Sequence, residues 1–198
     1  MPREIEISNR HPRLSLKRRE LVRALHHLDA HFAFTAADLP TLSPAGLARA
    51  QSQSKNASKN SAPNTTRPSA APAGELSLSF LTDPALARLH ADYLNDPSTT
   101  DVITFEGDEA LNHAGDVCVS VDTAIAYATC HQLPFAEELT RYVIHGWLHL
   151  AGFDDLVPAK KRRMRAAENR ALKLLHSAGL LPSFSLKPTA APARRARA

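Results

Sequence analysis

The sequence predicts one α+β (mixed α/β) domain: a small mixed sheet of about four strands packed with five to six helices. Four short segments, at 4–8, 75–81, 101–105 and 116–120, alternate apolar and polar residues as strands do. Longer segments among them repeat apolar residues every three or four positions, which is typical of amphipathic helices. At 198 residues the chain is also long enough to bury one sizeable core.

The first strand places Ile5 and Ile7 on one side. Ser15 is expected to cap a helix that runs through Leu16, Leu21, Leu25 and Leu28. In the second strand Leu76, Leu78 and Phe80 point one way. Thr82 or Asp83 caps the next helix, because Pro84 fits its first turn.

Val117 and Val119 of the fourth strand alternate against Cys118, which we expect to be a small buried hydrophobe without a disulfide partner. Asp122 starts a helix that ends near Leu133, and Pro134 opens another. That second helix is apolar around much of its circumference, so it is expected to be the central one. A last helix runs from about 158 to 176 and stops at Gly179.

Two segments are expected to be disordered, since they have almost nothing to bury. One is an insertion at 43–74 within the domain of residues 1–181, and the other is the basic tail at 182–198. Each holds four cations and no acid, so the remainder carries a charge of −4 although the whole chain has +4. A basic tail can bind nucleic acid through phosphates, or it can only aid solubility. No apolar run is long enough for a membrane span or a secretory leader, which predicts a cytoplasmic protein.

The run from His145 to Asp155 carries the chemistry. His145 and His149 are four residues apart, so on a helix they share one face and can reach one metal ion. Gly152 permits a sharp exit from the helix, after which Asp155 can return as a third ligand. Three protein ligands leave one position open on zinc, as in catalytic sites.

Three ordered motifs give this chain a family resemblance. They are Thr100-Asp101-Val102-Ile103-Thr104-Phe105, then Gly115-Asp116-Val117-Cys118-Val119-Ser120, then the run from His145 to Asp154. In this order they resemble the YbeY family of bacterial metal-dependent endoribonucleases, and Met164 and Glu168 match it as well. The resemblance implies one Zn²⁺, cleavage of single-stranded RNA, maturation of the 3′ end of small-subunit (16S) rRNA and a role in ribosome quality control. The partners it implies are rRNA and the ribosome or a small-subunit precursor.

The chain departs from the family pattern at two positions. The family normally has a third histidine where this chain has Asp155, and many members have an arginine where it has Leu94. A carboxylate is a competent zinc ligand, but it lowers the charge of the centre and makes iron or manganese more credible. Asp154 and Asp116 are candidates for a base, although Asp154 equally suits a structural role. Lys160, Lys161, Arg162 and Arg163 are candidates for binding RNA phosphates, or a solvated helix face.

Other functions remain open from the residues alone. A non-catalytic RNA-binding ribosome-assembly factor with a structural metal is one alternative. An iron(II) oxygenase is another, because two histidines and a carboxylate form its ligand set. A metalloprotease is disfavoured, since Gly146 stands where such enzymes carry a glutamate.

Overall fold

The computed structural model describes residues 2–35, 38 and 73–188. A mixed sheet in the order β1-β3-β5-β4 forms its centre. β1 (Ile5–Asn9), β3 (Glu75–Leu81) and β5 (His113–Ser120) run parallel, while β4 (Val102–Glu106) lies antiparallel beside β5. All four predicted strands are therefore confirmed, and their ends differ from the predicted ones by at most three residues.

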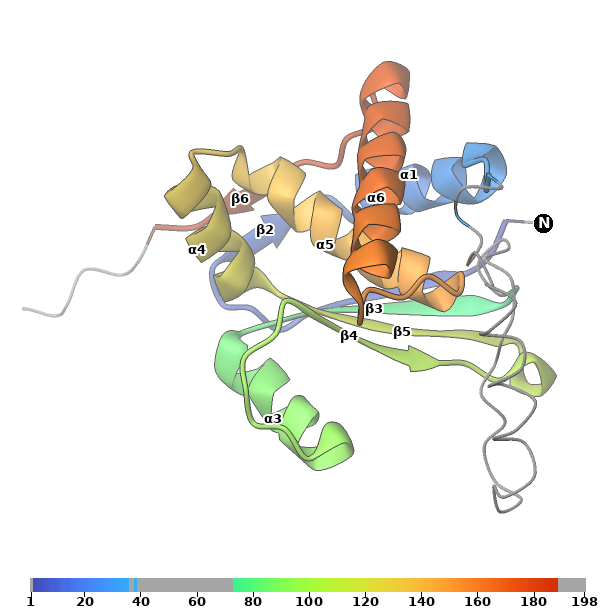
Figure 1. Cartoon of the computed structure of the whole chain (residues 1–198). Helices are drawn as coiled ribbons and strands as arrows, with labels where there is room; N and C mark the ends of the chain where they lie inside the picture. Colours follow the sequence, from blue (N-terminus) through green and yellow to red (C-terminus); the bar gives the residue numbers. More distant parts are fainter. Residues whose placement is uncertain (1, 36–37, 39–72, 189–198) are drawn as a thin grey trace, which may run out of the picture.

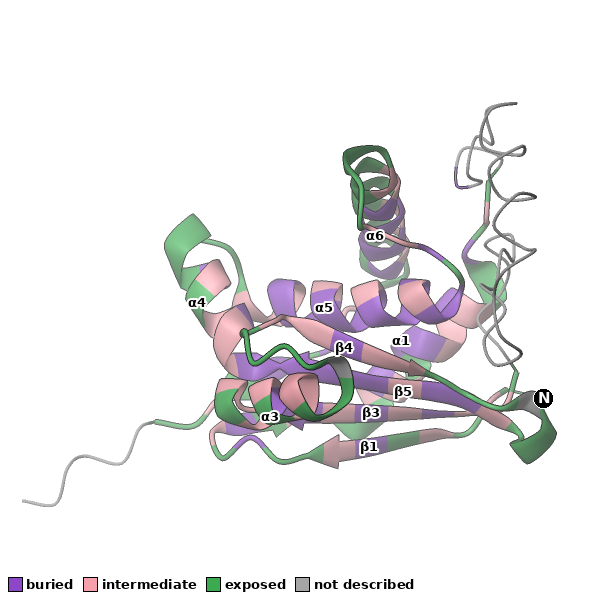
Figure 2. Cartoon of the chain, turned by 60° about the horizontal axis from the view of Figure 1, so that its bottom comes forward, coloured by how far each residue is buried: buried purple, intermediate pink, exposed green. Residues whose placement is uncertain are grey.

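Helices cover both faces of this sheet (Figures 1 and 2). One face carries α1 (Arg18–His31), α4 (Val121–His131), α5 (Phe135–Leu150) and α6 (Pro158–Ala178), and the other carries α3 (Asp83–Leu94). A short 3-10 helix, η2 (Glu109–Leu111), precedes β5. Five α-helices in the described residues and the mixed sheet confirm the predicted α+β class. In this part of the chain no helix is both long and apolar enough to cross a membrane.

Side chains of β5 alternate between the two faces of the sheet, and each face has its own hydrophobic cluster. Val117 and Val119 belong to the large cluster beneath α5, whereas Cys118 joins Leu86 and Ile103 in a smaller cluster beneath α3. Cys118 is buried with a free thiol, as predicted.

The central position predicted for α5 is also confirmed, and a glycine makes it possible. Ten residues of this helix are buried, among them Trp147, whose indole nitrogen donates to Asp29 Oδ1 at 3.0 Å. A Cβ at Gly146 would lie 2.3 Å from Val117 Cγ1 and 3.0 Å from Val102 Cγ1. Since non-bonded carbon atoms pack best about 3.5–4.0 Å apart, only a residue without a side chain lets α5 lie this close to the sheet.

Helix ends agree with the sequence in most places. Thr82 occupies the N-cap position of α3, with Pro84 in the first turn, and Gly179 ends α6 with a φ of 63°. The capping role predicted for Ser15 is wrong. Ser15 lies in β2 (Leu14–Leu16), and α1 begins three residues later with Lys17 at its N-cap.

β2 pairs with a strand that the sequence did not predict, β6 (Phe184–Leu186). The expectation of disorder over 182–198 is wrong for these strand residues, because Phe184 is buried with its ring centroid 5.8 Å from that of Phe80. Residues 189–198 lie outside the described residues, as do residues 43–72 of the expected insertion at 43–74. Of the expected insertion, residues 73–74 are described, and they directly precede the first residue of β3.

Candidate metal centre

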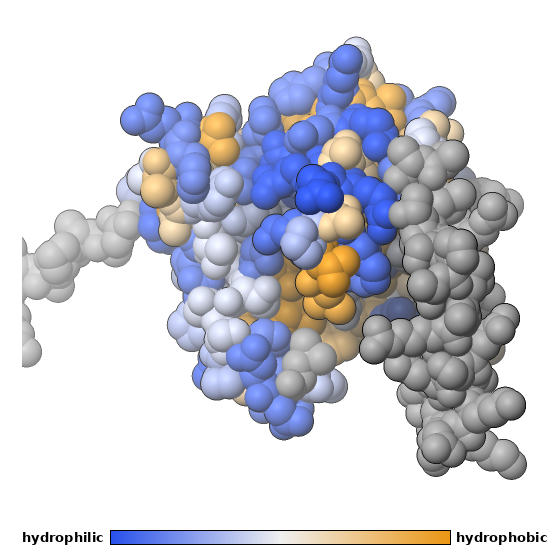
Figure 3. All heavy atoms as spheres, viewed as in Figure 1, coloured by the Kyte–Doolittle hydropathy of each residue, from blue (hydrophilic) through white to orange (hydrophobic). Residues whose placement is uncertain are grey.

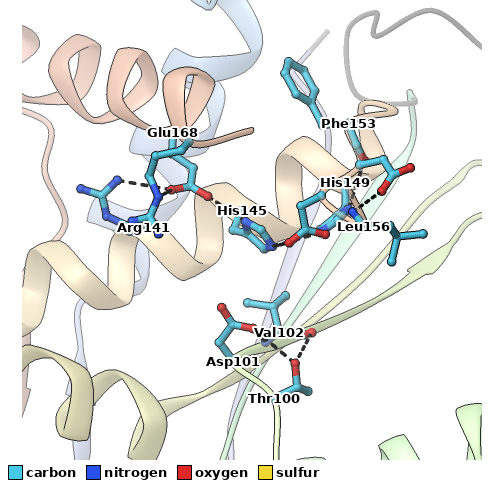
Figure 4. Close-up of polar contacts among 12 residues, drawn as sticks. Thr100, Asp101, Val102, Arg141, His145, His149, Phe153, Leu156 and Glu168 are labelled. Atoms are coloured by element: carbon cyan, nitrogen blue, oxygen red, sulfur yellow. Dashed lines mark hydrogen bonds and ion pairs between the residues drawn. The ribbon is translucent and has the colours of Figure 1, made fainter. Parts of the chain in front are cut away.

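His145 and His149 meet at the C-terminal end of α5, where it overlies the sheet (Figure 4). Their rings are almost perpendicular, at 86°, and their Nε2 atoms are 3.0 Å apart. A zinc ion bound by two imidazoles about 2.0–2.1 Å away holds the nitrogens at a similar separation. The helical spacing therefore brings the two rings together as the sequence predicted.

Asp155 completes a group of three. Its Oδ2 lies 3.9 Å from His145 Nε2, and its Oδ1 lies 3.8 Å from His149 Nε2. The chain returns there because it leaves α5 through Gly152, whose φ is 91°, with the amide of Phe153 donating to Leu148 O at 3.0 Å. One ligand atom from each of the three side chains lies within 4.8 Å of the others, so the group could hold a metal ion.

The outer nitrogens of both rings are already engaged. His145 Nδ1 is 2.8 Å from Glu168 Oε1, and His149 Nδ1 is 3.1 Å from the carbonyl oxygen of Phe153. A carbonyl or carboxylate oxygen can only accept, so both Nδ1 atoms carry hydrogen and both Nε2 atoms of the neutral rings are acceptors. Two acceptors cannot face each other at 3.0 Å unless a cation, either a proton or a metal ion, lies between them. This donor set fits a divalent metal.

The pKa values of the two histidines are shifted in opposite directions. Burial lowers the pKa of His145, but the hydrogen bond that it donates to Glu168 and the charges of Asp101, Glu168 and Asp155 outweigh it, so the pKa is raised. The pKa of His149 is lowered by burial and then by His145 beside it. Without a metal, His145 therefore holds an added proton more readily than His149 does.

The carboxylates that the sequence singled out as candidate bases have charged partners of their own, and Asp154 also acts on His149 through its charge. Asp154 accepts from the amide of Leu156 at 2.8 Å and from Lys160 Nζ, which leaves it tied to the loop before α6. Burial raises the pKa of Asp154, but these partners outweigh it and lower the pKa. Asp116 lies on β5, 3.4 Å from His113 Nε2.

A cavity of about 410 Å³ opens beside the metal group and contains residues that the sequence did not single out for it. Of the four predicted RNA-binding residues only Lys161 lines it, together with Arg141, Arg165, Glu168 and Asp101. Glu168 is 5% exposed, and although burial raises its pKa, the hydrogen bond and charge of His145 and the nearby arginines lower the pKa below its usual range. For Arg141 the signal in the sequence is its spacing of four residues from His145 on α5, and for Glu168 it is the match to the family pattern.

A family model described as Endoribonuclease YbeY matches residues 47–176. The chain belongs to the endoribonuclease YbeY family. A curated YbeY from Phocaeicola vulgatus is 38% identical over 102 residues, which is 52% of this chain and 74% of the relative. The YbeY of Protochlamydia amoebophila is 40% identical over 100 residues, or 48% and 67% of the two chains. A solution structure from Thermotoga maritima aligns with a TM-score of 0.45 and 15% identity, covering 89% of this chain and 94% of the other.

Proposed function

We propose that this protein is a metal-dependent endoribonuclease that cleaves single-stranded RNA in the cytoplasm. The substrate proposed for it is the precursor of small-subunit (16S) rRNA at its 3′ end, with ribosome quality control as a second role. Membership of the endoribonuclease YbeY family supports RNA cleavage, and the facing imidazoles of His145 and His149 support the metal dependence. An iron(II) oxygenase or a metalloprotease has no comparable support.

The metal would be held by His145, His149 and Asp155, with Zn²⁺ as the first candidate and iron or manganese as others. The chemistry that a divalent ion supplies in such a site is Lewis acidity, which polarises a phosphoryl oxygen and makes water more acidic. The protein's part is orientation. Glu168 holds the ring of His145, and the carbonyl of Phe153 holds that of His149, so both Nε2 atoms face the same point.

Asp101 adds negative charge on the opposite side of the cavity. Its Oδ1 accepts from the amide of Val102 at 3.0 Å and from Thr100 Oγ1 at 3.3 Å, which fixes the carboxylate at the start of β4 (Figure 4). Its charge raises the pKa of His145. A fixed carboxylate there favours a cation in the site over a neutral pair of rings.

Two measurements test the proposal. Purified protein should contain one metal ion by elemental analysis, and the His149→Ala variant should contain none. His176→Ala is the matched control, because this half-exposed histidine pairs with Glu137 far from the group. Full metal content in the His149→Ala variant would contradict the assigned ligands.

The second measurement is cleavage of a labelled single-stranded RNA with chelator, without it, and with each metal restored in turn. Cleavage that chelator abolishes and one metal restores supports the proposed enzyme. The alternative is an RNA-binding assembly factor with a structural metal, which Asp155 favours through the lower charge it gives the centre. RNA binding without cleavage under every metal would establish that alternative.

A further inference from the structure

Arg141 occupies a position from which it can act on a ligand in the cavity beside the metal group. It precedes His145 by four residues, so it lies on the same face of α5, about 6 Å along the helix axis. Both residues line the cavity. Its volume, about 410 Å³, is within the range of sites that hold small molecules, so it accommodates a group of nucleotide size.

The guanidinium of Arg141 is held in place by acceptors on one side. Nη1 donates to Asn169 Oδ1 at 2.8 Å and to Glu168 Oε2 at 3.3 Å, and Nε lies 3.6 Å from Glu138 Oε2. The side chain is only 16% exposed. Among the described residues, Nη2 makes no hydrogen bond, so this nitrogen can donate to a ligand.

The cavity is lined by charges of both signs. Glu138 and Glu168, beside Arg141, are 3% and 5% exposed, Asp101 and Asp155 are half-buried, and Lys161 and Arg165 are exposed cations. Arg165 Nε lies 3.7 Å from Glu168 Oε2, so Arg165 and Arg141 flank the same carboxylate. Figure 3 shows that hydrophilic residues predominate on the side where α5 and α6 lie. A ligand that enters between these cations meets three positive side chains.

We propose that Arg141 and Arg165 form a phosphate-binding subsite for the RNA strand next to the metal group. Arginine suits this role because its planar guanidinium has several N–H donors. Some of them can bind phosphate oxygens while the others hold the side chain in place. This inference rests on the proposed function, since it names the part of the protein that binds the backbone of the substrate.

The test measures binding of a short fluorescent single-stranded RNA by anisotropy, in chelator, over a range of salt concentrations. Each phosphate contact adds about 0.7 to the slope of log affinity against log salt for a single strand. Arg141→Gln keeps a polar side chain beside Glu168 but removes the charge, so it should lower the slope by about 0.7 and the affinity roughly tenfold. A purely structural arginine would leave the slope unchanged.

Lys173→Gln is the control, because this exposed lysine lies on α6 two turns beyond Arg165 and does not line the cavity. It should change neither slope nor affinity. Arg165→Gln provides a second test at the surface if Arg141→Gln does not fold, as judged by circular dichroism, and it should also lower the slope.

The subsite is overturned if Arg141→Gln binds RNA as wild type does, or if Arg165→Gln does so where Arg141→Gln does not fold. An equal loss of binding in Lys173→Gln would also overturn it. If the wild-type protein neither binds nor cleaves RNA, the proposed function fails and the subsite fails with it. If wild type binds and cleaves RNA while the arginine variants behave as wild type, only this inference fails.

Discussion

Substituting Gly146 by alanine tests whether the close approach of α5 to the sheet builds the metal centre. In a helix interior, alanine is favoured over glycine by about 0.8–1.0 kcal/mol, so propensity alone predicts a more stable protein. Packing predicts the opposite. The new Cβ would lie 2.3 Å from Val117 Cγ1, and Val117 is buried, β-branched and stiff.

Overpacking of this kind costs about 1–3 kcal/mol, and the second close contact, with Val102, places this case in the upper part of that range. After the gain in propensity, the expected net loss is about 2 kcal/mol, which lowers Tm by roughly 4–8 °C in a domain of this size. Metal affinity should fall as well, because a displaced α5 moves both histidines relative to Asp155 and Glu168, which lie outside that helix.

The assay is thermal unfolding by circular dichroism with chelator present, followed by metal titration of the folded protein. Val117→Ala in the same background is the control, since it removes the methyl groups that the new Cβ would meet. The double variant should be more stable than the sum of the single effects. A Gly146→Ala protein that is about 1 kcal/mol more stable than wild type, with unchanged metal affinity, would refute the packing argument.

Three further predictions follow from other contacts. Glu168→Gln should weaken metal binding roughly 10- to 100-fold in a competition titration, because the ring of His145 loses its charged partner; unchanged affinity would contradict that role. In native protein at pH 8, one thiol should react with Ellman's reagent, and two should react after unfolding. The reason is that Cys130 is exposed while burial raises the pKa of Cys118 to about 11. Rapid reaction of both thiols in the native protein would be inconsistent with the core beneath α3. Hydrogen bonds from Lys17 and Ser183 lower the pKa of Glu20 to about 2 from 4.5. The ionised Glu20 carboxylate therefore stabilises the folded protein fully above pH 4.5, and this stabilisation disappears as the pH falls through 2. Urea unfolding should therefore show Glu20→Gln less stable than wild type at pH 7 and equal to it near pH 2, and a difference that persists at low pH would argue against the contact.

The predictions that succeeded rest on local patterns. Val117, Cys118 and Val119 alternate in a strand, and the histidines of α5 recur at the helical spacing, so the sequence specifies each within a few residues. Asp155 is equally local, because one glycine turn returns it to the end of the same helix. The fold class and the candidate ligands were accessible from the sequence for this reason.

The features that were missed depend on partners far apart in the chain. β2 and β6 have three residues each, too few to show a period, and they pair Leu14 with Leu186 across most of the chain. The local surroundings of Ser15 suit a helix cap, whereas its pairing with β6 decides its conformation. Arg141 and Glu168 belong to helices whose packing no spacing rule predicts.

Glu168 gives the site a property that neither the histidines nor the arginines have separately. Its Oε1 orients His145 and its Oε2 holds Arg141, so one carboxylate joins the metal group to the proposed phosphate subsite. Substitutions should therefore separate into three patterns when metal affinity and the salt slope of RNA binding are both measured. His149→Ala should lose metal and keep the slope in chelator, and Arg141→Gln should keep metal and lose slope. Glu168→Gln should reduce both, since removal of its charge weakens the contacts that position both partners. A Glu168→Gln protein that changes only one of the two quantities would show that the two groups act independently.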